Sequence, residues 1–212
     1  MCRERINLNG SDAVEQEYSA SLTGEPFLYF ELKQVARLKA AGLSNQEIKK
    51  KITEENLFQY STNKSVVRIL RATLRRIAVL DETLLNFLAR GSLPSSKLVA
   101  LISIMKTNRL FSEFMAEVYL EKVRIGEEAL AHKDFRLFFA HKAEQSPRVA
   151  GWREYTCKKL SQVYANILLG AGLITGTKQK VLTPPLLEQE LLVHLKNTGN
   201  QRIINVITGG RM

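Results

Sequence analysis

The chain has 212 residues, of which 45% are hydrophobic, and a net charge of +10. Its length and apolar content are enough to bury a core, in one large domain or two to three small ones. Its apolar runs fall far below the roughly 20 residues that span a bilayer, and Met1–Gly10 lacks the apolar stretch of a secretory signal. We therefore expect a globular cytoplasmic protein with no membrane partner.

The positive charge is concentrated in two blocks. Residues 1–30 sum to −3, residues 31–80 to +7, residues 81–150 to +1 and residues 151–212 to +5. A basic surplus of this kind attracts polyanions, and with membranes set aside nucleic acid is the ordinary candidate.

Residues 1–17 are polar and irregular, so we expect them to be flexible. The next stretch, residues 18–80, predicts a domain of three helices. It begins as a loop with Gly24 and Pro26, and its first helix runs from the aromatic residues at 27–30 to about Ala41.

The second helix of this domain is clearly delimited. Gly42 suits the end of the preceding helix, and Ser44 with Glu47 three residues later forms a capping-box pattern. Ile48 and Ile52 then give the helix an inner face.

The third helix has two distinct faces. Its start is predicted by Ser61, Thr62 and Asn63, which can accept hydrogen bonds from first-turn N–H groups. An apolar stripe with helical spacing follows, formed by Val66, Leu70, Leu74 and Ile77. A row of cations falls within a sector of roughly 60° on another side, formed by Lys64, Arg68, Arg71 and Arg75.

Two helices arranged in this way predict a helix-turn-helix in which the cations and the helix start contact phosphates. Asn63 and Arg68 are placed where they could also read bases. The alternative is a solvated face, which is our interpretation of Lys49–Lys51. The row on the third helix contains three arginines, and no acid occurs between Glu55 and Asp81, so we favour a binding face there.

Residues 81–148 read as helices throughout and carry ten cations against nine acids. That balance is what a solvated helical bundle needs. We therefore predict a packing module that also contacts partner proteins.

Residues 149–212 predict a winged-helix-like region. A long helix from Val149 to Gly170 or Gly172 precedes two β-prone pieces, Leu173–Thr175 and Lys180–Thr183, which predict a small hairpin. The hairpin could instead simply cover a core. The second basic block then consists of Lys158 and Lys159 on the helix and Lys178 and Lys180 on the wing.

A last helix is predicted after Pro184 and Pro185, and the chain from Gly199 onward reads as a loose or partner-docked tail. Spare apolar surface on this helix could support a homo-oligomer. It would come from Leu187, Leu191 and Leu195.

Nothing in the sequence predicts an enzyme, a cofactor or a metal site. Gly170, Gly172 and Gly176 miss the dinucleotide fingerprint by one residue and follow a helix rather than a strand. Cys2 and Cys157 are the only cysteines, the three histidines have no ligand-type residue at suitable spacing, and the basic blocks lack grouped carboxylates.

Three segments of the chain carry a family resemblance, and they read YSASLTGEPFLYFELKQVARLKAAGLSNQEIKKKI, RATLRRIAVL and WREYTCKKLSQVYANILLGAGLI. Together they resemble the BrxA family of bacteriophage exclusion (BREX) defence systems. The resemblance extends over nearly all of the chain beyond Tyr18. It implies an all-helical protein with helix-turn-helix character, encoded beside a methyltransferase, an ATPase and a phosphatase-like protein that together mark host DNA and block phage. It carries over no catalytic residues.

Three hypotheses follow for the function. The first is a non-catalytic component of the defence system that binds double-stranded DNA through the third helix. The second is a scaffold that binds other proteins of the system through the middle region. The third is RNA binding, which would use the same cations but also require exposed aromatic side chains for stacking.

Overall fold

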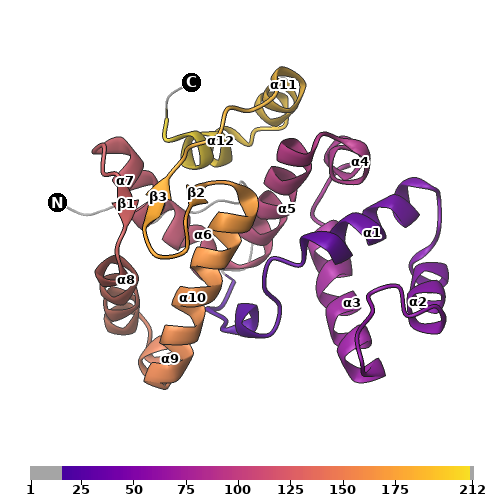
Figure 1. The fold of residues 1–212 in the computed structure, drawn as a ribbon, viewed down its shortest axis with the longest axis horizontal. Coiled ribbons are helices and arrows are strands. Elements are labelled where there is room, and N and C mark those ends of the chain that lie inside the picture. The colour runs from indigo at the N-terminus through magenta and orange to yellow at the C-terminus, as the bar shows by residue number, and fades with distance from the viewer. Residues whose placement is uncertain (1–15, 211–212) are drawn as a thin grey trace. The chain divides into compact units, whose positions relative to one another are not determined.

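The computed structural model describes residues 16–210, so the flexibility expected at the N-terminus falls mostly outside the described residues. The fold is mainly helical with one small three-stranded sheet, which confirms the expected fold class (Figure 1). The described chain divides into two compact units. One spans Phe27–Thr107, and the other combines residues 16–26 with residues 108–210.

The unit Phe27–Thr107 contains five helices. The three predicted helices are α1 (Tyr29–Ala40), α2 (Asn45–Glu54) and α3 (Asn63–Ile77). They are completed by α4 (Glu82–Arg90) and α5 (Leu93–Thr107). Because α4 packs on α1, and α5 packs on α3 and α4, both belong to the core of this unit, whereas the sequence pattern had suggested a boundary at residue 80.

The helix ends in this unit follow local chemistry. Gly42 adopts φ +89°, in the left-handed region that favours glycine at a helix end. The capping box is present, since the Ser44 N–H donates to Glu47 Oε2 at 2.8 Å and the Glu47 N–H donates to Ser44 Oγ at 3.3 Å. The Ser44 hydroxyl, which donates to Glu47 Oε2 at 2.6 Å, and then the Ser44 N–H lower the pKa of the Glu47 carboxyl.

The connection between α2 and α3 is longer than the three- or four-residue turn of a helix-turn-helix. It spans residues 55–62, and Asn56 and Gln59 both adopt positive φ values there. Phe58 is buried and anchors the connection to the unit.

One arginine of α3 is structural. Arg76 is 1% exposed, and its Nη1 donates to the Phe27 carbonyl oxygen at 3.2 Å. The apolar side of α3 is broader than the predicted stripe, because Ile69 and Ala72 are buried as well.

In the second unit a continuous helical segment runs through α6 (Arg109–Phe114), a π-helical turn η2 (Met115–Tyr119) and α7 (Leu120–Arg124). It is followed by α8 (His132–Gln145), the short α9 (Pro147–Ala150) and α10 (Glu154–Ala171). A short 3-10 turn, η1 (Ser21–Thr23), packs against α10. Aromatic rings fill the centre, where Phe114 lies 5.0 Å from Phe135 and 5.1 Å from Tyr164 between ring centroids.

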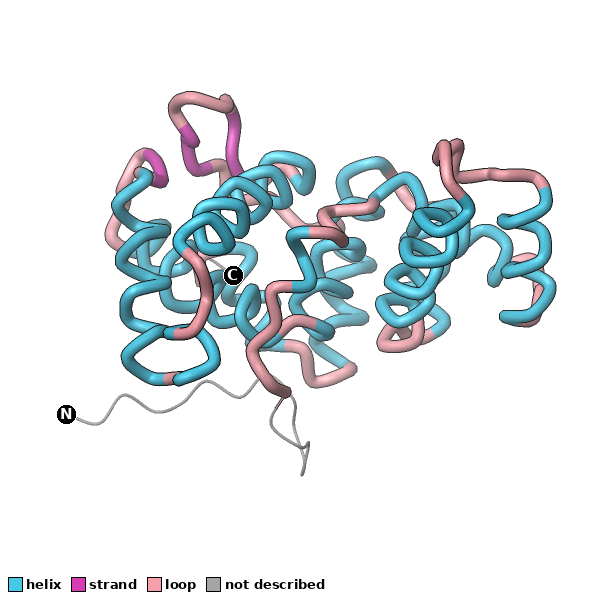
Figure 2. Tube along the Cα trace, turned by 90° about the horizontal axis from the view of Figure 1, so that it is seen from below, coloured by secondary structure: helices cyan, strands magenta, loops and turns pink. Residues whose placement is uncertain are grey.

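The expected hairpin is present, and α10 leads directly into it (Figure 1). Its strands are β2 (Ile174–Thr175) and β3 (Lys180–Leu182). A third strand, β1 (Ala129–Leu130), pairs with β3 and gives the antiparallel order β1-β3-β2. This strand lies in the stretch that had been expected to be helical throughout, and Figure 2 shows the three strands together.

The end of the described chain corrects two expectations. The segment after Gly199 is not a loose tail, because it forms α12 (Gln201–Thr208), whose Ile203, Ile204 and Ile207 are buried. In α11 (Gln189–Asn197), Leu191 and Leu195 are fully buried within the chain, so they offer no spare surface for a second copy. Leu187, just before α11, is also buried.

Candidate nucleic-acid interface

The predicted binding residues of α3 and its N-terminal approach all lie on the surface. Each of them is exposed, whereas Val66, Leu70 and Ile77 on the apolar side are buried. The structure therefore brings together the whole first set, namely Ser61, Thr62, Asn63, Lys64, Arg68, Arg71 and Arg75.

The start of α3 is capped by Thr62. Its Oγ1 accepts a hydrogen bond from the Ser65 N–H at 3.3 Å, which confirms the predicted helix start. A helix has no internal acceptor for its first N–H groups, so those of Asn63 and Lys64 remain available to an anion.

The tertiary structure adds one acid beside this face. Tyr60 Oη donates to Glu31 Oε1 at 2.7 Å, which ties the α2–α3 connection to α1. Burial, followed by the hydrogen bond and charge of Glu31, raises the pKa of Tyr60 to about 12, and the nearby Arg68 acts in the opposite direction. Sequence spacing could not reveal this neighbour, because Glu31 is 37 positions before Arg68.

The second predicted set is dispersed. On α10 Lys158 is exposed and Lys159 is half-buried, and Lys178 is exposed in the turn between β2 and β3. Lys180 corrects the prediction for the wing: it lies in β3 and is only 8% exposed. In the sheet it lies opposite Leu130 of β1, and that pairing was not predicted.

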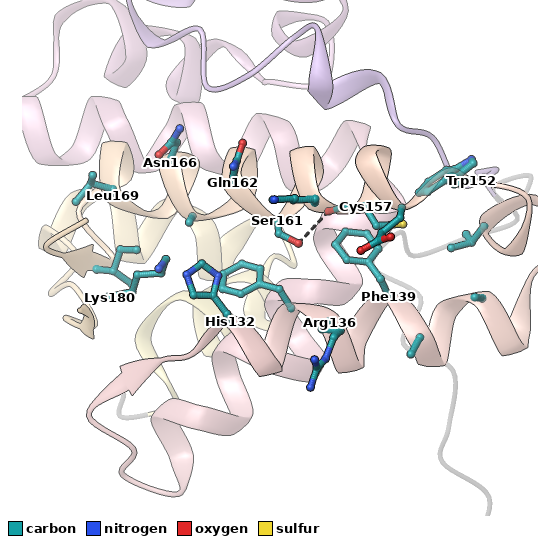
Figure 3. A pocket seen from close by; sticks show the side chains of 18 of the residues that line it. His132, Arg136, Phe139, Trp152, Cys157, Ser161, Gln162, Asn166, Leu169 and Lys180 are labelled. Atoms are coloured by element: carbon teal, nitrogen blue, oxygen red, sulfur yellow. Dashed lines mark hydrogen bonds between the residues drawn. The ribbon is translucent and has the colours of Figure 1, made fainter. Parts of the chain in front are cut away.

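A groove of about 820 Å³ runs between α8 and α10 and is closed at one end by the hairpin (Figure 3). We call it the α8–α10 groove. Lys180 and His132 lie at one end of it, and Trp152 lies at the other. Phe139 and Leu169 contribute apolar surface.

The groove also collects polar groups that no sequence motif had connected. Arg136 from α8 and Lys158 from α10 line its walls together with Gln162 and Asn166. These residues lie on two separate helices, and no spacing pattern in the sequence links them. Only a prediction that α8 packs against α10 could have grouped them.

Catalytic chemistry has little support in this groove. Ser161 Oγ donates to the Cys157 carbonyl oxygen at 2.9 Å, so its hydroxyl is held by the helix backbone. Burial raises the pKa of the Cys157 thiol, which disfavours the reactive thiolate.

Among residues 16–210, no helix is long and apolar enough to cross a membrane. Within the same range, no three histidine, cysteine, aspartate or glutamate side chains gather as a metal site would require.

Comparison with known proteins assigns the chain to a family. The BrxA family model matches residues 16–199. A BREX protein BrxA from Bacillus cereus (strain H3081.97) is 38% identical over 92% of this chain and 98% of the relative. A second, from Escherichia coli O9:H4 (strain HS), is 21% identical over 93% of this chain and 92% of the relative.

A solved structure agrees in fold. The crystal structure of an uncharacterized protein from Magnetospirillum magneticum superposes with a TM-score of 0.76 and 21% identity, covering 91% of this chain and 98% of that one. Together the family match and the curated relatives confirm the resemblance seen in the sequence, and the chain belongs to the BrxA family.

Proposed function

We propose that this protein is a non-catalytic, DNA-binding component of a BREX phage-defence system, acting in the cytoplasm. Its place in the system follows from the BREX proteins to which it is similar. The DNA-binding role rests on one observation above all: four cations lie exposed on one side of α3, opposite its buried side.

The geometry of α3 suits a duplex. The helix has 15 residues and is therefore about 22 Å long at 1.5 Å per residue, long enough for its row of cations to contact several phosphates. The free N–H groups at its start add a phosphate contact, and Asn63 and Arg68 are candidates for contacts with base edges. We expect modest sequence preference, because an arginine row contacts the backbone more readily than bases.

The hairpin supports a secondary contact. A long helix followed by a hairpin, with a third strand pairing in the order β1-β3-β2, has the element order of a winged helix. Lys178 is exposed in its turn and would contact one phosphate. Lys180 is buried, so we leave it out of the proposed DNA surface.

The decisive experiment measures duplex binding as a function of salt concentration. With four to five phosphate contacts, log K should fall with log salt at a slope of about −4. The triple variant Arg68→Ala, Arg71→Ala, Arg75→Ala should lose most of the affinity and reduce the slope by about 2.7. An RNA hairpin measured in parallel should bind more weakly, because no aromatic residue belongs to the cationic row.

The matched control removes the same number of charges from the same unit. Lys49, Lys50 and Lys51 are exposed on α2, and their alanine variant should change the slope by less than about 1. A flat salt response of the wild type, or equal losses in the two triple variants, would exclude α3 as the binding face.

A second candidate function is contact with another protein of the defence system. Ile125 is 67% exposed and Leu137 is 51% exposed, and both line a shallow groove of about 220 Å³ beside α7 and α8. Exposed apolar side chains that share a concave surface are typical of protein-contact sites.

Co-purification from cells that express the complete system tests this second function. Ile125→Glu with Leu137→Glu should remove a BREX partner from the purified complex while preserving duplex binding. Leu186→Glu, at a position 89% exposed and outside this groove, serves as the control. Retention of every partner by the double variant would refute the contact.

A further inference from the structure

We propose that the α8–α10 groove binds a nucleoside phosphate, with the phosphate at Lys180 and the base along the apolar middle of the groove. This site is separate from the duplex surface proposed on α3. No residue of α3 lines the groove, whose described lining comes from residues 132–180.

Lys180 is the observation that carries the proposal. Only 8% of its surface is exposed, and its side chain makes no hydrogen bond or ion pair with any residue among 16–210. Its nitrogen end points into the groove toward His132 (Figure 3). A buried ammonium without a counter-charge is costly, so an anion that binds there would be favoured.

Asp134, the buried acid nearest to Lys180 in the sequence, already has partners of its own. Asp134 Oδ1 lies 3.2 Å from Lys122 Nζ, and its Oδ2 accepts from the Ala131 N–H at 2.8 Å. The only acid in the described lining of the groove is Glu154 at the start of α10, close in sequence to Trp152 at the opposite end. The described lining therefore places no carboxylate at the Lys180 end of the groove.

The rest of the groove distinguishes a nucleotide from a simple anion. Phe135 and Phe139 from α8 and Ala165 and Leu169 from α10 all contribute apolar surface to the lining, which provides a place for a flat ring. Gln162 and Asn166, one helical turn apart on α10, present amide groups that can donate to and accept from the polar edge of a base. A fatty acid would require the apolar middle but not these amides.

The size of the site agrees with this ligand class. A volume of about 820 Å³ lies within the range of small-molecule and cofactor sites. Arg136 and Lys158 line the walls and would attract a phosphate on approach.

The chain has a single tryptophan, Trp152, and it lines the groove, so its fluorescence can report occupancy. The full chain would be titrated with AMP, adenosine, inorganic phosphate and octanoate. AMP should give a saturable change with Kd below about 1 mM. Adenosine and phosphate alone should bind at least about tenfold more weakly, because each supplies only part of the contacts.

Variants then locate the site. Lys180→Met should weaken AMP binding at least about tenfold, the effect of losing a charge-assisted hydrogen bond. Lys178→Met, in the exposed hairpin turn, should bind AMP as the wild type does. Gln162→Phe fills the groove from an exposed position, so it should weaken AMP binding even if Lys180→Met fails to fold.

Three outcomes would overturn the proposal: no saturable response to AMP, undiminished binding by Gln162→Phe, or octanoate binding as tightly as AMP. Duplex binding by Gln162→Phe should match the wild type. The result for the groove is therefore independent of the result for α3.

Discussion

Replacing Glu113 with glutamine should destabilise the second unit more than any exposed charge change. Glu113 is 8% exposed and accepts hydrogen bonds from Tyr18 Oη at 2.7 Å and from Arg109 Nε at 2.8 Å. Lys142 Nζ lies 2.5 Å from its Oε2 and 2.6 Å from Glu117 Oε1. This cluster holds the segment that contains Tyr18 against α6 and α8.

The magnitude follows from burial. Removing one partner of a buried ion pair costs about 3–5 kcal/mol, because the remaining charge loses its compensation. Glutamine keeps an acceptor oxygen, and Lys142 keeps Glu117, so we expect the lower end, about 3 kcal/mol. With a urea m-value of about 1.5 kcal/mol/M, the unfolding midpoint should fall by about 2 M.

Urea unfolding followed by Trp152 fluorescence measures this change, because the single tryptophan reports on the same unit. Glu121→Gln is the matched control. It breaks an ion pair of 3.7 Å to Arg124 whose side chains are 58% and 51% exposed, and should cost less than about 1 kcal/mol. Similar midpoints for the Glu113 and Glu121 variants would refute the assigned role of the cluster.

Three further predictions concern the pH dependence of stability, the cap of α3 and the helix α12. Burial alone would raise the pKa of Glu113, but the hydrogen bonds from Lys142, Arg109 and Tyr18 outweigh burial and lower this pKa. The stability that Glu113 contributes is therefore fully present above pH 4.5, the pKa in the unfolded chain, and is lost as the pH falls through the lower pKa of the folded chain. Urea midpoints measured against pH should show this loss in the wild type and a smaller one in Glu113→Gln. Thr62→Ala should cost about 1 kcal/mol and accelerate hydrogen exchange of the α3 amides, and unchanged exchange would mean that the cap is not stabilising. Deleting residues 201–212 removes the buried isoleucines of α12 and should lower the melting temperature, whereas an unchanged value would favour the loose tail.

The sequence alone determined the features that depend on neighbours a few residues apart. The capping box at Ser44, the left-handed Gly42 and the Thr62 cap involve groups within one helical turn, so composition and spacing suffice to predict them. The exposed row on α3 was predictable for the same reason. Its residues share a helix with an apolar stripe, and burying that stripe turns the cations toward solvent.

Short strands and weakly marked helices escaped this reasoning. Two-residue β1 has no period to detect, and α12 was missed although its isoleucines recur at helical spacing, because the glycines around it suggested a loop. The helices α4 and α5 were recognised, but their packing against α1 and α3 depends on which apolar faces meet. Such a choice involves residues far apart in the chain.

Only the tertiary structure decided the environment of individual charges. Lys180 and Lys178 are two residues apart and look equivalent in the sequence, yet Lys180 is buried in β3, opposite β1, while Lys178 stays exposed in the turn. Arg76 lies beside Arg75 on α3, but a rotation of about 100° per residue turns it into the core, where the Phe27 carbonyl accepts its hydrogen bond. Whether a cation contacts solvent, a backbone oxygen or the lining of a groove depends on chain segments that come together only on folding, and local spacing carries no information about them.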